Sequence, residues 1–273
     1  AVQTFTLSTR LTRLGAPRSV DVCFANFTEL LITDPVRLVA YPLIAVAALF
    51  AYSARVGSPT ELLSAGASAI ELNIYYIPAD LAETGRDVEE RYLEVVRAVK
   101  AAVSIPVAVK LGPCFSAIGQ MAREIVLAGA DGLVLFNRFY QPDFDIDKIG
   151  ITRTLDLSVP AEIRPGLLWL AVLYGRVGAS LAATTGVETY REVVKYLMAG
   201  ADVVMTTSSL LRHGPEHLER LLEGLTDWLL EHDYSSLDDL RGCMGLNRVP
   251  DATAYERANY IRILEEFEAP EFA

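Results

Sequence analysis

Continuous apolar runs alternate with amphipathic stretches along most of the chain. The runs indicate strands buried on both faces, because in a parallel sheet covered on both sides apolar residues do not alternate with polar ones. The stretches between them carry apolar residues at helical spacing. The predicted strands span 69–75, 106–111, 132–137, 179–184 and 202–207, and the predicted helices span 87–103, 116–128, 161–175, 188–198 and 214–231.

A short junction recurs where predicted helices pass into predicted strands. Its copies are Ala65-Gly66-Ala67, Ala128-Gly129-Ala130 and Ala199-Gly200-Ala201. A glycine just past a helix suits the left-handed backbone conformation that ends many helices. Each copy therefore predicts a tight loop between a helix and a buried strand.

Strands that alternate with helices predict parallel βαβ units whose helices lie outside the sheet. Five such units occupy residues 60–230, and residues 41–50 offer a sixth strand. We therefore expect the α/β class and a single-domain (β/α)8 TIM barrel with a diverged or incomplete N-terminal part. The expected divisions are an atypical N-terminal segment at 1–55, parallel barrel units at 56–250 and a C-terminal helix at 251–273, with helical pattern over 251–267.

Net charge, the length of the apolar runs and the spacing of the cysteines argue against nucleic acid, membrane and metal as partners of this chain. The formal net charge of -11 argues against a general nucleic-acid binder, which would carry a basic patch. The longest apolar run, 38–52, contains Pro42 and is too short to span a bilayer. Cys23, Cys114 and Cys243 lie far apart without a CxxC motif, which indicates the reducing cytoplasm and no zinc or disulfide framework. We expect a cytoplasmic protein with a small-molecule substrate, no nucleic acid and no membrane.

Polar residues end five successive predicted strands. The carboxyl ends of parallel barrel strands share one rim, and chemistry sits at that rim. A barrel used only as a scaffold does not need polar groups there, so the set predicts a functional site. Its members are Asn73, Lys110, Asn137, Thr184-Thr185-Gly186 and Thr206-Thr207-Ser208.

Lys110 carries the sharpest signal, because it ends the apolar run IPVAVKL. Its ammonium could be a fixed positive charge beside a cofactor or a developing anion. It could instead form a Schiff base with a carbonyl substrate. A third interpretation is an ion pair with Glu71, which shares the side of its strand with Asn73 by the period of two; the pair and a functional role are compatible.

The other rim residues favour ligand binding when taken together. Asn73 and Asn137 offer both donor and acceptor groups, which suit a carboxylate, a uracil-like ring or an isoalloxazine edge; alternatively each amide satisfies loop backbone. The two threonine clusters each precede a predicted helix, which is typical of an anion site. Simple N-capping is the alternative for them.

Three other features favour ordinary structural roles. His213 and His217 are four residues apart but lack an HExxH motif, which favours a solvated helix face over a metal site. The alternating aspartates of 143–147 lack the glycine and glutamate of a calcium loop. Cys114 follows Lys110 closely, but a buried or spectator thiol is favoured over a catalytic one. We predict no metal site. The long segment 138–160 is an excursion of the kind that often forms a lid.

These residues resemble the dihydroorotate dehydrogenase family, and within it the branch called dihydroorotate dehydrogenase-like. The family comprises FMN-dependent (β/α)8 barrels of pyrimidine synthesis. The resemblance covers residues 58–268, and the combination of ELN, VKL and LFNR in this order is its most specific part. The matching segments are AIELNIYYIPAD, IPVAVKLGP, ADGLVLFNRFYQPDFDID, ASLAATTGV, MAGADVVMTTSSLLRHG and YERANYIRIL.

The resemblance implies a cofactor, FMN, and a role for each residue. Dihydroorotate would lose one hydrogen as a proton to a base and one as a hydride to flavin N5. Asn73 and Asn137 would contact substrate or flavin, and Lys110 would stabilise the reduced anionic ring. A homodimer, which is common in the family, is the assembly to test. The FMN phosphate would be held by Thr185, Gly186, Thr207 and Ser208.

The chain departs from the family pattern at two places. Where orotate-forming members carry a Cys or Ser base after the ELN strand, the nearest position here is Tyr76, and tyrosine is a poor base because its pKa is about 10. The family's first two strands, with a further lysine and an asparagine-bearing loop, have no match in residues 1–55. Three alternatives stay open: an FMN oxidoreductase with a different substrate, a Schiff-base lyase using Lys110, and an inactive incomplete barrel.

Overall fold

The computed structural model describes residues 44–46, 68–74, 76–138, 142–152, 154, 156–255 and 258–266. Its main element is a six-stranded sheet in the order β1-β8-β7-β4-β3-β2, in which every neighbouring pair is parallel. The described strands form an α/β half-barrel, which is a partial TIM barrel. Their bounds are β1 Ile44–Val46, β2 Ile70–Asn73, β3 Val107–Leu111, β4 Gly132–Leu135, β7 Ser180–Ala183 and β8 Val203–Thr206.

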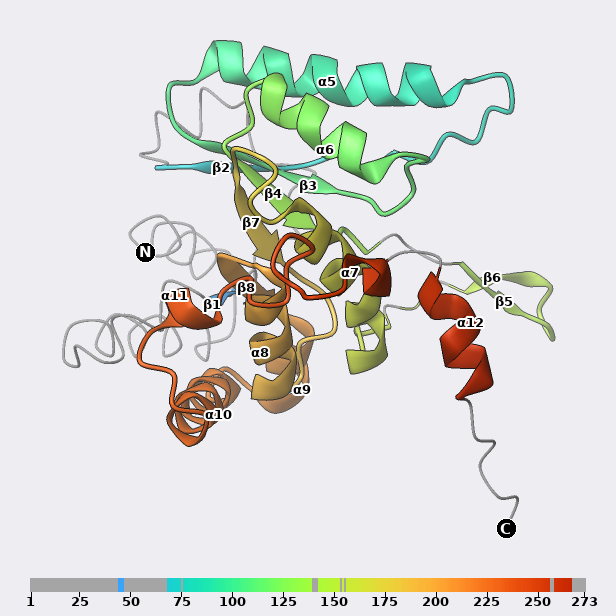
Figure 1. Ribbon diagram of the computed structural model, residues 1–273. Coiled ribbons are helices and arrows are strands. Elements are labelled where there is room, and N and C mark those ends of the chain that lie inside the picture. Colours follow the sequence, from blue (N-terminus) through green and yellow to red (C-terminus); the bar gives the residue numbers. More distant parts are fainter. Residues whose placement is uncertain are drawn as a thin grey trace.

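Helices follow the strands and cover one face of the sheet (Figure 1). Helices α5 and α6 lie beside β2 and β3, and α7 and α8 lie beside β7 and β8. None of the helices described is long and apolar enough to cross a membrane. The helical segments are α5 Gly85–Ala102, α6 Ile118–Leu127, η3 Pro160–Ile163, α7 Arg164–Leu173, α8 Tyr190–Ala199, α9 Ser208–His213, α10 His217–Glu231, α11 Leu237–Leu240, η4 Ala252–Tyr255 and α12 Ala258–Glu265.

The five strands predicted from apolar runs are confirmed to within two residues at each end. β1 falls inside the sixth stretch, 41–50, and the rest of the N-terminal prediction lies outside the described residues. The single helix predicted at 214–231 is wrong at its start. Gly214 takes a φ of 85° and Pro215 follows, so the backbone breaks between α9 and α10. The helical pattern predicted over 251–267 is a 3-10 turn, η4, followed by α12.

The excursion over 138–160 contains a second, separate sheet. Strands β5, Asp143–Asp145, and β6, Gly150–Thr152, form an antiparallel hairpin in which Phe144 pairs with Ile151. Figure 1 shows this hairpin extending away from the half-barrel. The excursion therefore projects outward at its middle and returns to the strand ends at both of its own ends.

The recurring junction closes two helices in the same way. Gly129 and Gly200 both have a φ of 112°. The alanine after each glycine donates its N–H to a carbonyl five residues earlier. Ala130 N–H donates to Ile125 O at 3.2 Å, and Ala201 N–H donates to Tyr196 O at 3.0 Å. This is the Schellman arrangement, in which a left-handed glycine satisfies the last carbonyls of the helix.

An aspartate after each of these junctions ties the new strand to the one before it. Asp131 Oδ2 accepts a 2.8 Å hydrogen bond from the N–H of Val107 on β3, and Lys100 Nζ lies 2.8 Å from the same oxygen. Asp202 Oδ2 accepts an equivalent 2.8 Å bond from the N–H of Leu181 on β7. The aspartate after the junction thus holds two neighbouring strands together at their amino ends. These ends lie opposite the rim that carries the polar residues.

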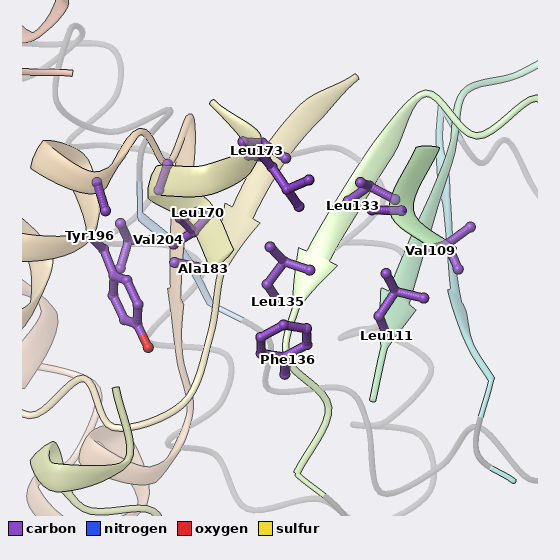
Figure 2. Packing of buried hydrophobic residues seen from close by; sticks show 14 of the residues in the cluster. Val109, Leu111, Leu133, Leu135, Phe136, Leu170, Leu173, Ala183, Tyr196 and Val204 are labelled. Carbon is purple, nitrogen blue, oxygen red and sulfur yellow. The ribbon is translucent and has the colours of Figure 1, made fainter. Parts of the chain in front are cut away.

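The described residues form a separate apolar cluster on each face of the sheet. The outer face meets the helices in the main apolar cluster, where Figure 2 shows Leu133 and Leu135 of β4 beside Leu170 and Leu173 of α7. The inner face holds a separate, small cluster of Val134 and Met205 with partly buried Ala108, Ala182 and Val203. Lys110 follows Ala108 by two residues on β3, so it shares the inner face.

Candidate functional site

A cavity of about 150 Å³ opens at the carboxyl ends of β3, β4, β7 and β8. Eight residues of the rim set predicted from the sequence line it: Lys110, Asn137, Thr184, Thr185, Gly186, Thr206, Thr207 and Ser208. The cavity brings together the ends of four strands, as expected for a barrel rim. The remaining lining residues are Phe136, Arg138, Ser158 and Val187.

Lys110 is almost fully buried, with 8% of its surface exposed. In the register of the sheet it stands directly beside Asn73 on β2. Its Nζ lies 3.7 Å from Glu71 Oε1, an ion pair that is too long for a hydrogen bond. Burial raises the pKa of Glu71, although attraction to Lys110 opposes the rise. The ion pair considered from the sequence is therefore present, and the lysine also lines the cavity.

Two carboxamides meet beside Lys110. Asn137 Nδ2 donates to Asn73 Oδ1 at 2.5 Å, and the backbone N–H of Asn137 donates to Leu111 O at 2.6 Å. The contact uses one donor of Asn137 and one acceptor of Asn73. The side-chain NH2 group of Asn73 and the side-chain oxygen of Asn137 can therefore form hydrogen bonds with a ligand.

The turn after β7 has an unusual backbone. Thr185 and Gly186 are both in the left-handed region, with φ of 81° and 72°. A Cβ on Gly186 would lie 2.7 Å from Ile163 Cγ2 and 2.8 Å from Val159 O, so only glycine fits there. The turn packs against η3 at the end of the excursion.

Buried Tyr196 supports this turn from below. Its hydroxyl lies 3.1 Å from Thr184 O and 2.9 Å from Thr185 O. Burial raises the pKa of Tyr196 above its usual value, so the phenol stays protonated as a donor. Thr185 Oγ1 in turn donates to Phe136 O at 3.3 Å.

Simple N-capping does not account for the two threonine clusters. Helix α8 is capped by Thr189, further along the chain, in a capping box with Glu192. The side chain of Thr207 makes no capping bond to α9. The hydroxyls of Thr184, Thr185 and Thr207 therefore do not cap helices α8 and α9.

Ser158 joins the site although no motif or periodic pattern singles it out. Its Oγ accepts from the N–H of Gly186 at 3.1 Å and donates to Ser208 Oγ at 2.9 Å. Its own N–H also donates to Ser208 Oγ at 3.1 Å. The available clue is its position at the end of the excursion, since the other end, Arg138, lines the same cavity.

Cations surround the cavity. Arg138 Nε lies 2.8 Å from Glu162 Oε1, and its guanidinium also donates to the carbonyl of Asp156. Arg212 donates to Ser158 O at 2.7 Å from behind the lining. Among the lining residues that the structure describes, Lys110 and Arg138 are basic and none is acidic, although the chain as a whole is acidic. The cavity therefore favours an anion.

The late histidines pair with a carboxylate next to this region. Glu188 accepts from Arg212 Nη1 and from His213 Nε2, each at 2.5 Å. Partial burial opposes ionisation, but these two contacts hold the pKa of Glu188 below its usual value. His217 Nε2 lies 2.7 Å from the backbone oxygen of Glu188. His213 is exposed and His217 partly buried, and both contact Glu188 in the loop after β7.

Three site residues considered from the sequence, Asn73, Tyr76 and Cys114, lie outside the cavity lining, and Asn73 reaches it through its contact with Asn137. Tyr76 donates to Glu83 Oε2 at 2.5 Å, and the guanidinium of Arg91 lies 4.2 Å from its ring centroid. Cys114 is exposed in the loop after β3. Across the described ranges, no three His, Cys, Asp or Glu side chains come together in a metal-binding group. A role for Tyr76 as acid or base stays a prediction.

The donor set fits one end of a phosphorylated, anionic ligand. The Gly186 N–H and the Ser158 and Ser208 hydroxyls form one polar cluster, and Lys110 lies elsewhere in the same lining. Hydroxyls, backbone N–H groups and ammonium ions are the groups that proteins use for phosphates and anionic rings. The residues present therefore fit FMN at its phosphate and at an anionic ring edge.

Comparisons with known proteins agree with this geometry. The model of the dihydroorotate dehydrogenase family matches residues 60–229, which is more than half of the chain. The catalytic subunit of dihydroorotate dehydrogenase B (NAD(+)) from Methanothermobacter thermautotrophicus is 30% identical over 199 residues, 68% of this chain and 65% of that protein. A protein of Aeropyrum pernix, provisionally named dihydroorotate dehydrogenase A (fumarate), is 28% identical over 84% of this chain and 76% of its own length.

A third relative covers less. The dihydroorotate dehydrogenase B (NAD(+)) catalytic subunit of Petrotoga mobilis is 33% identical over 54% of this chain and 50% of its own length. The chain thus spans between half and about three quarters of the length of these relatives.

Proposed function

Since the chain belongs to the dihydroorotate dehydrogenase family, a family of FMN-dependent dehydrogenases, we propose that it binds FMN and catalyses an FMN-dependent oxidation. The lining of the rim cavity is the observation that supports the proposal. It contains Lys110 and the hydroxyl pair of Ser158 and Ser208, and none of the described lining residues is a carboxylate. A phosphate and an anionic ring are the two groups that such a lining accommodates. When bound, FMN supplies a hydride acceptor.

The phosphate end would be held by the turn after β7 and the start of α9. The Gly186 N–H and the hydroxyls of Ser158, Thr207 and Ser208 are the donors proposed for it. Arg212 holds the backbone of Ser158 from behind, and so keeps that hydroxyl in place. The left-handed backbone at Thr185 and Gly186 brings the turn to the cavity.

The reactive end would lie against Lys110. A buried ammonium next to the ring favours electron density that accumulates there during reduction, because fixed charges act strongly where water is excluded. Glu71 holds the ammonium from the inner face of the sheet at 3.7 Å. The Asn73–Asn137 pair would orient the substrate or the ring edge through its remaining donor and acceptor.

We propose dihydroorotate as the substrate, oxidised to orotate, because this is the reaction of the family. The uracil-like edge of dihydroorotate and its carboxylate match the donor and acceptor ends of a carboxamide pair. A different cyclic or enoate substrate is the second candidate. One observation favours it: Tyr76, at the position of the family's base, contacts Glu83 and does not line the cavity.

Titration of the purified protein with FMN tests the cofactor. We expect quenching of FMN fluorescence at one equivalent and a visible flavin spectrum that stays with the protein through gel filtration. Ser208→Ala should weaken binding about tenfold, which corresponds to about 1.4 kcal/mol, a charge-assisted hydrogen bond. Lys148→Met, an exposed lysine on the β5–β6 hairpin, is the control and should bind normally. A folded protein that takes up no FMN would support the inactive incomplete barrel instead.

Anaerobic addition of dihydroorotate to the FMN-loaded protein tests the substrate. Bleaching of the flavin by dihydroorotate supports the proposed reaction, whereas bleaching only by another reductant supports the second candidate. Lys110→Met should slow the bleaching far more than it lowers the midpoint of thermal unfolding. Borohydride trapping of a phosphosugar on Lys110 would support the Schiff-base lyase and contradict both FMN reactions.

A further inference from the structure

Residues 156–159 end the excursion without belonging to a helix or a strand, and the structure describes all four of them. Ser158 is nevertheless only 7% exposed, and its Oγ lies between the N–H of Gly186 and the hydroxyl of Ser208. Buried backbone groups need hydrogen-bond partners, and a segment without a neighbouring strand must obtain them from side chains. The side chains around this segment therefore decide where the Ser158 hydroxyl lies.

The first of these partners is the ion pair of Arg212 and Glu188. Arg212 Nη2 donates to Ser158 O at 2.7 Å, while Nη1 of the same guanidinium donates to Glu188 Oε2 at 2.5 Å. The two side chains are 27% and 22% exposed, so their contact is partly shielded from water and salt. Because the guanidinium is a rigid planar fork, the carboxylate that binds one arm also fixes the arm that holds Ser158.

The second partner is the ion pair of Arg138 and Glu162. Arg138 Nε lies 2.8 Å from Glu162 Oε1, and its Nη1 donates to the carbonyl of Asp156. Glu162 Oε2 accepts a hydrogen bond from the N–H of Val159 at 2.6 Å. This pair therefore holds the backbone both before and after Ser158, and it joins the start of the excursion to its end.

The two pairs act on position more than on charge. Each arginine has its own carboxylate within 2.8 Å, so neither pair adds a net charge beside the cavity. Arg212, Glu188 and Glu162 are not among the described residues that line the cavity. They therefore influence a ligand through the backbone that they hold around the Ser158 hydroxyl, which makes them positioning residues.

We propose that the two ion pairs clamp residues 156–159 and that this clamp determines the preference of the site for a phosphorylated flavin over an unphosphorylated one. The proposal rests on the proposed function and deepens it, because it assigns the selectivity to residues behind the lining. The clamp acts through Ser158, whose hydroxyl contacts both Gly186 and Ser208. A donor that is held in place before the ligand arrives does not lose conformational freedom on binding, which favours the ligand that uses it.

Titrations of the full chain with FMN and with riboflavin, which lacks the phosphate, test the proposal. Arg212→Met and Glu162→Ala should each lower the ratio of the riboflavin Kd to the FMN Kd about tenfold, with the riboflavin Kd itself changed less than about twofold. Arg212→Lys and Glu162→Gln keep part of the contacts and should give intermediate ratios. Arg97→Met removes an exposed ion pair with Glu90 within α5; it is the matched control and should keep the wild-type ratio.

A double-mutant cycle tests whether the clamp acts through Ser158. Ser158→Ala should lower the ratio by itself, and adding Arg212→Met to it should lower the ratio no further, because residues that act through one group are not additive. Additive losses would overturn the proposal. Equal weakening of FMN and riboflavin binding would also overturn it, since a purely structural role predicts that result.

Hydrogen–deuterium exchange of the protein without flavin separates this proposal from the proposed function. The amides of Ser158, Val159 and Gly186 are all hydrogen-bonded within the clamped region. Peptides that cover them should exchange faster in Arg212→Met and Glu162→Ala than in the wild type, whereas peptides from β3 should not change. Unchanged exchange in both variants, with FMN still preferred, would overturn the clamp alone. A wild-type protein that does not prefer FMN to riboflavin would contradict the proposed function, and the selectivity proposed here would fall with it.

Discussion

At the scale of single residues, the central feature is the buried ion pair of Lys110 and Glu71. The Lys110 side chain is 9% exposed and the Glu71 side chain 19%. Glu71 Oε1 is buried and has no hydrogen-bond partner within the described part of the chain. Burial therefore raises the pKa of this carboxyl more than the nearby ammonium lowers it. The native state holds a proton on Glu71 more tightly than the unfolded chain does.

Glu71→Gln should change how stability depends on pH. A raised native pKa contributes stability that is present below the ordinary value of 4.5 and is lost as the pH rises through the native value. Glutamine cannot ionise. As the pH rises from 4.5 through the native pKa of Glu71, the free energy of unfolding of the wild-type protein should therefore fall relative to that of the variant. Urea unfolding at a series of pH values from acidic to neutral measures the difference. Glu94→Gln, at an exposed position on α5, is the control and should show the same pH dependence of stability as the wild type. A Glu71→Gln stability curve that runs parallel to the wild-type curve at all pH values would contradict the prediction.

Residue-level prediction from the sequence succeeds where a strand ends. Lys110, Asn137 and Gly186 are predictable because an apolar run stops at a polar group, and parallel strands bring such ends together. Ser158 escapes prediction because it ends a loop that has no periodic pattern. Tyr76 does not line the cavity, because its hydroxyl donates to Glu83 and the Arg91 guanidinium lies over its ring; its role as acid or base stays a prediction.

At the scale of elements, the turn after β7 is the most constrained connection. Its two left-handed residues, its contact with η3 and the Tyr196 hydroxyl beneath it leave little freedom. The turn also provides the N–H that contacts Ser158. Its backbone should therefore determine both stability and ligand binding.

Gly186→Ala should destabilise the protein by about 1–3 kcal/mol or more and weaken FMN binding. The left-handed φ is strained for alanine, and the added Cβ would overlap Ile163. Urea unfolding and FMN titration measure the two effects. Gly178→Ala is the control, because a Cβ added there meets no described heavy atom within 4 Å; it should change stability by less than about 0.5 kcal/mol. Equal effects of the two substitutions would refute this account.

The aspartate after a junction should stabilise the sheet in a pH-dependent way. The hydrogen bond from Lys100, and then that from the Val107 N–H, lower the pKa of Asp131 below 3.8. Its stabilisation is therefore present above that value and is lost as the pH falls through the native pKa. Asp131→Asn should cost about 1 kcal/mol or less at neutral pH, since the side chain is 48% exposed.

The loss should vanish at a pH below the native pKa of Asp131. Asp227→Asn, at an exposed position on α10, serves as the control in the same unfolding series. A loss for Asp131→Asn that does not change with pH would contradict the assignment of the charge.

Elements are predictable where burial is continuous. The strands and most helices follow from apolar runs and helical spacing, but the β5–β6 hairpin does not. Its sequence DFDID does alternate, but the run is short and its apolar residues are exposed in the hairpin. Exposed strands lack the apolar run that marks the others, and burial is what makes such runs necessary.

At the scale of the whole molecule, the described residues form two separate apolar clusters, one on each face of the sheet. Val109 belongs to the main cluster with the helices, whereas Val134, one strand away, packs with Met205 in the smaller cluster on the inner face. Both valines are buried. The same substitution on the two faces therefore tests how far the helical layer carries the stability.

Val109→Ala and Val134→Ala should each cost about 2–3 kcal/mol, because both side chains are almost fully buried and the cost of a deletion grows with the contacts left unfilled. Urea unfolding of the two variants measures both values. Unchanged slopes of free energy against urea would show that each variant unfolds over the same surface. A much smaller loss at Val134 than at Val109 would contradict the prediction and would mean that the inner face is packed less tightly than the outer one.

The aspartates that follow the helix-ending glycines also bear on how such a sheet assembles. Each of them binds an amide near the start of the preceding strand, Val107 in β3 or Leu181 in β7, so the alignment of these two strand pairs is decided locally. Strands added to or lost from the border of the sheet would therefore leave the alignment of these two pairs intact.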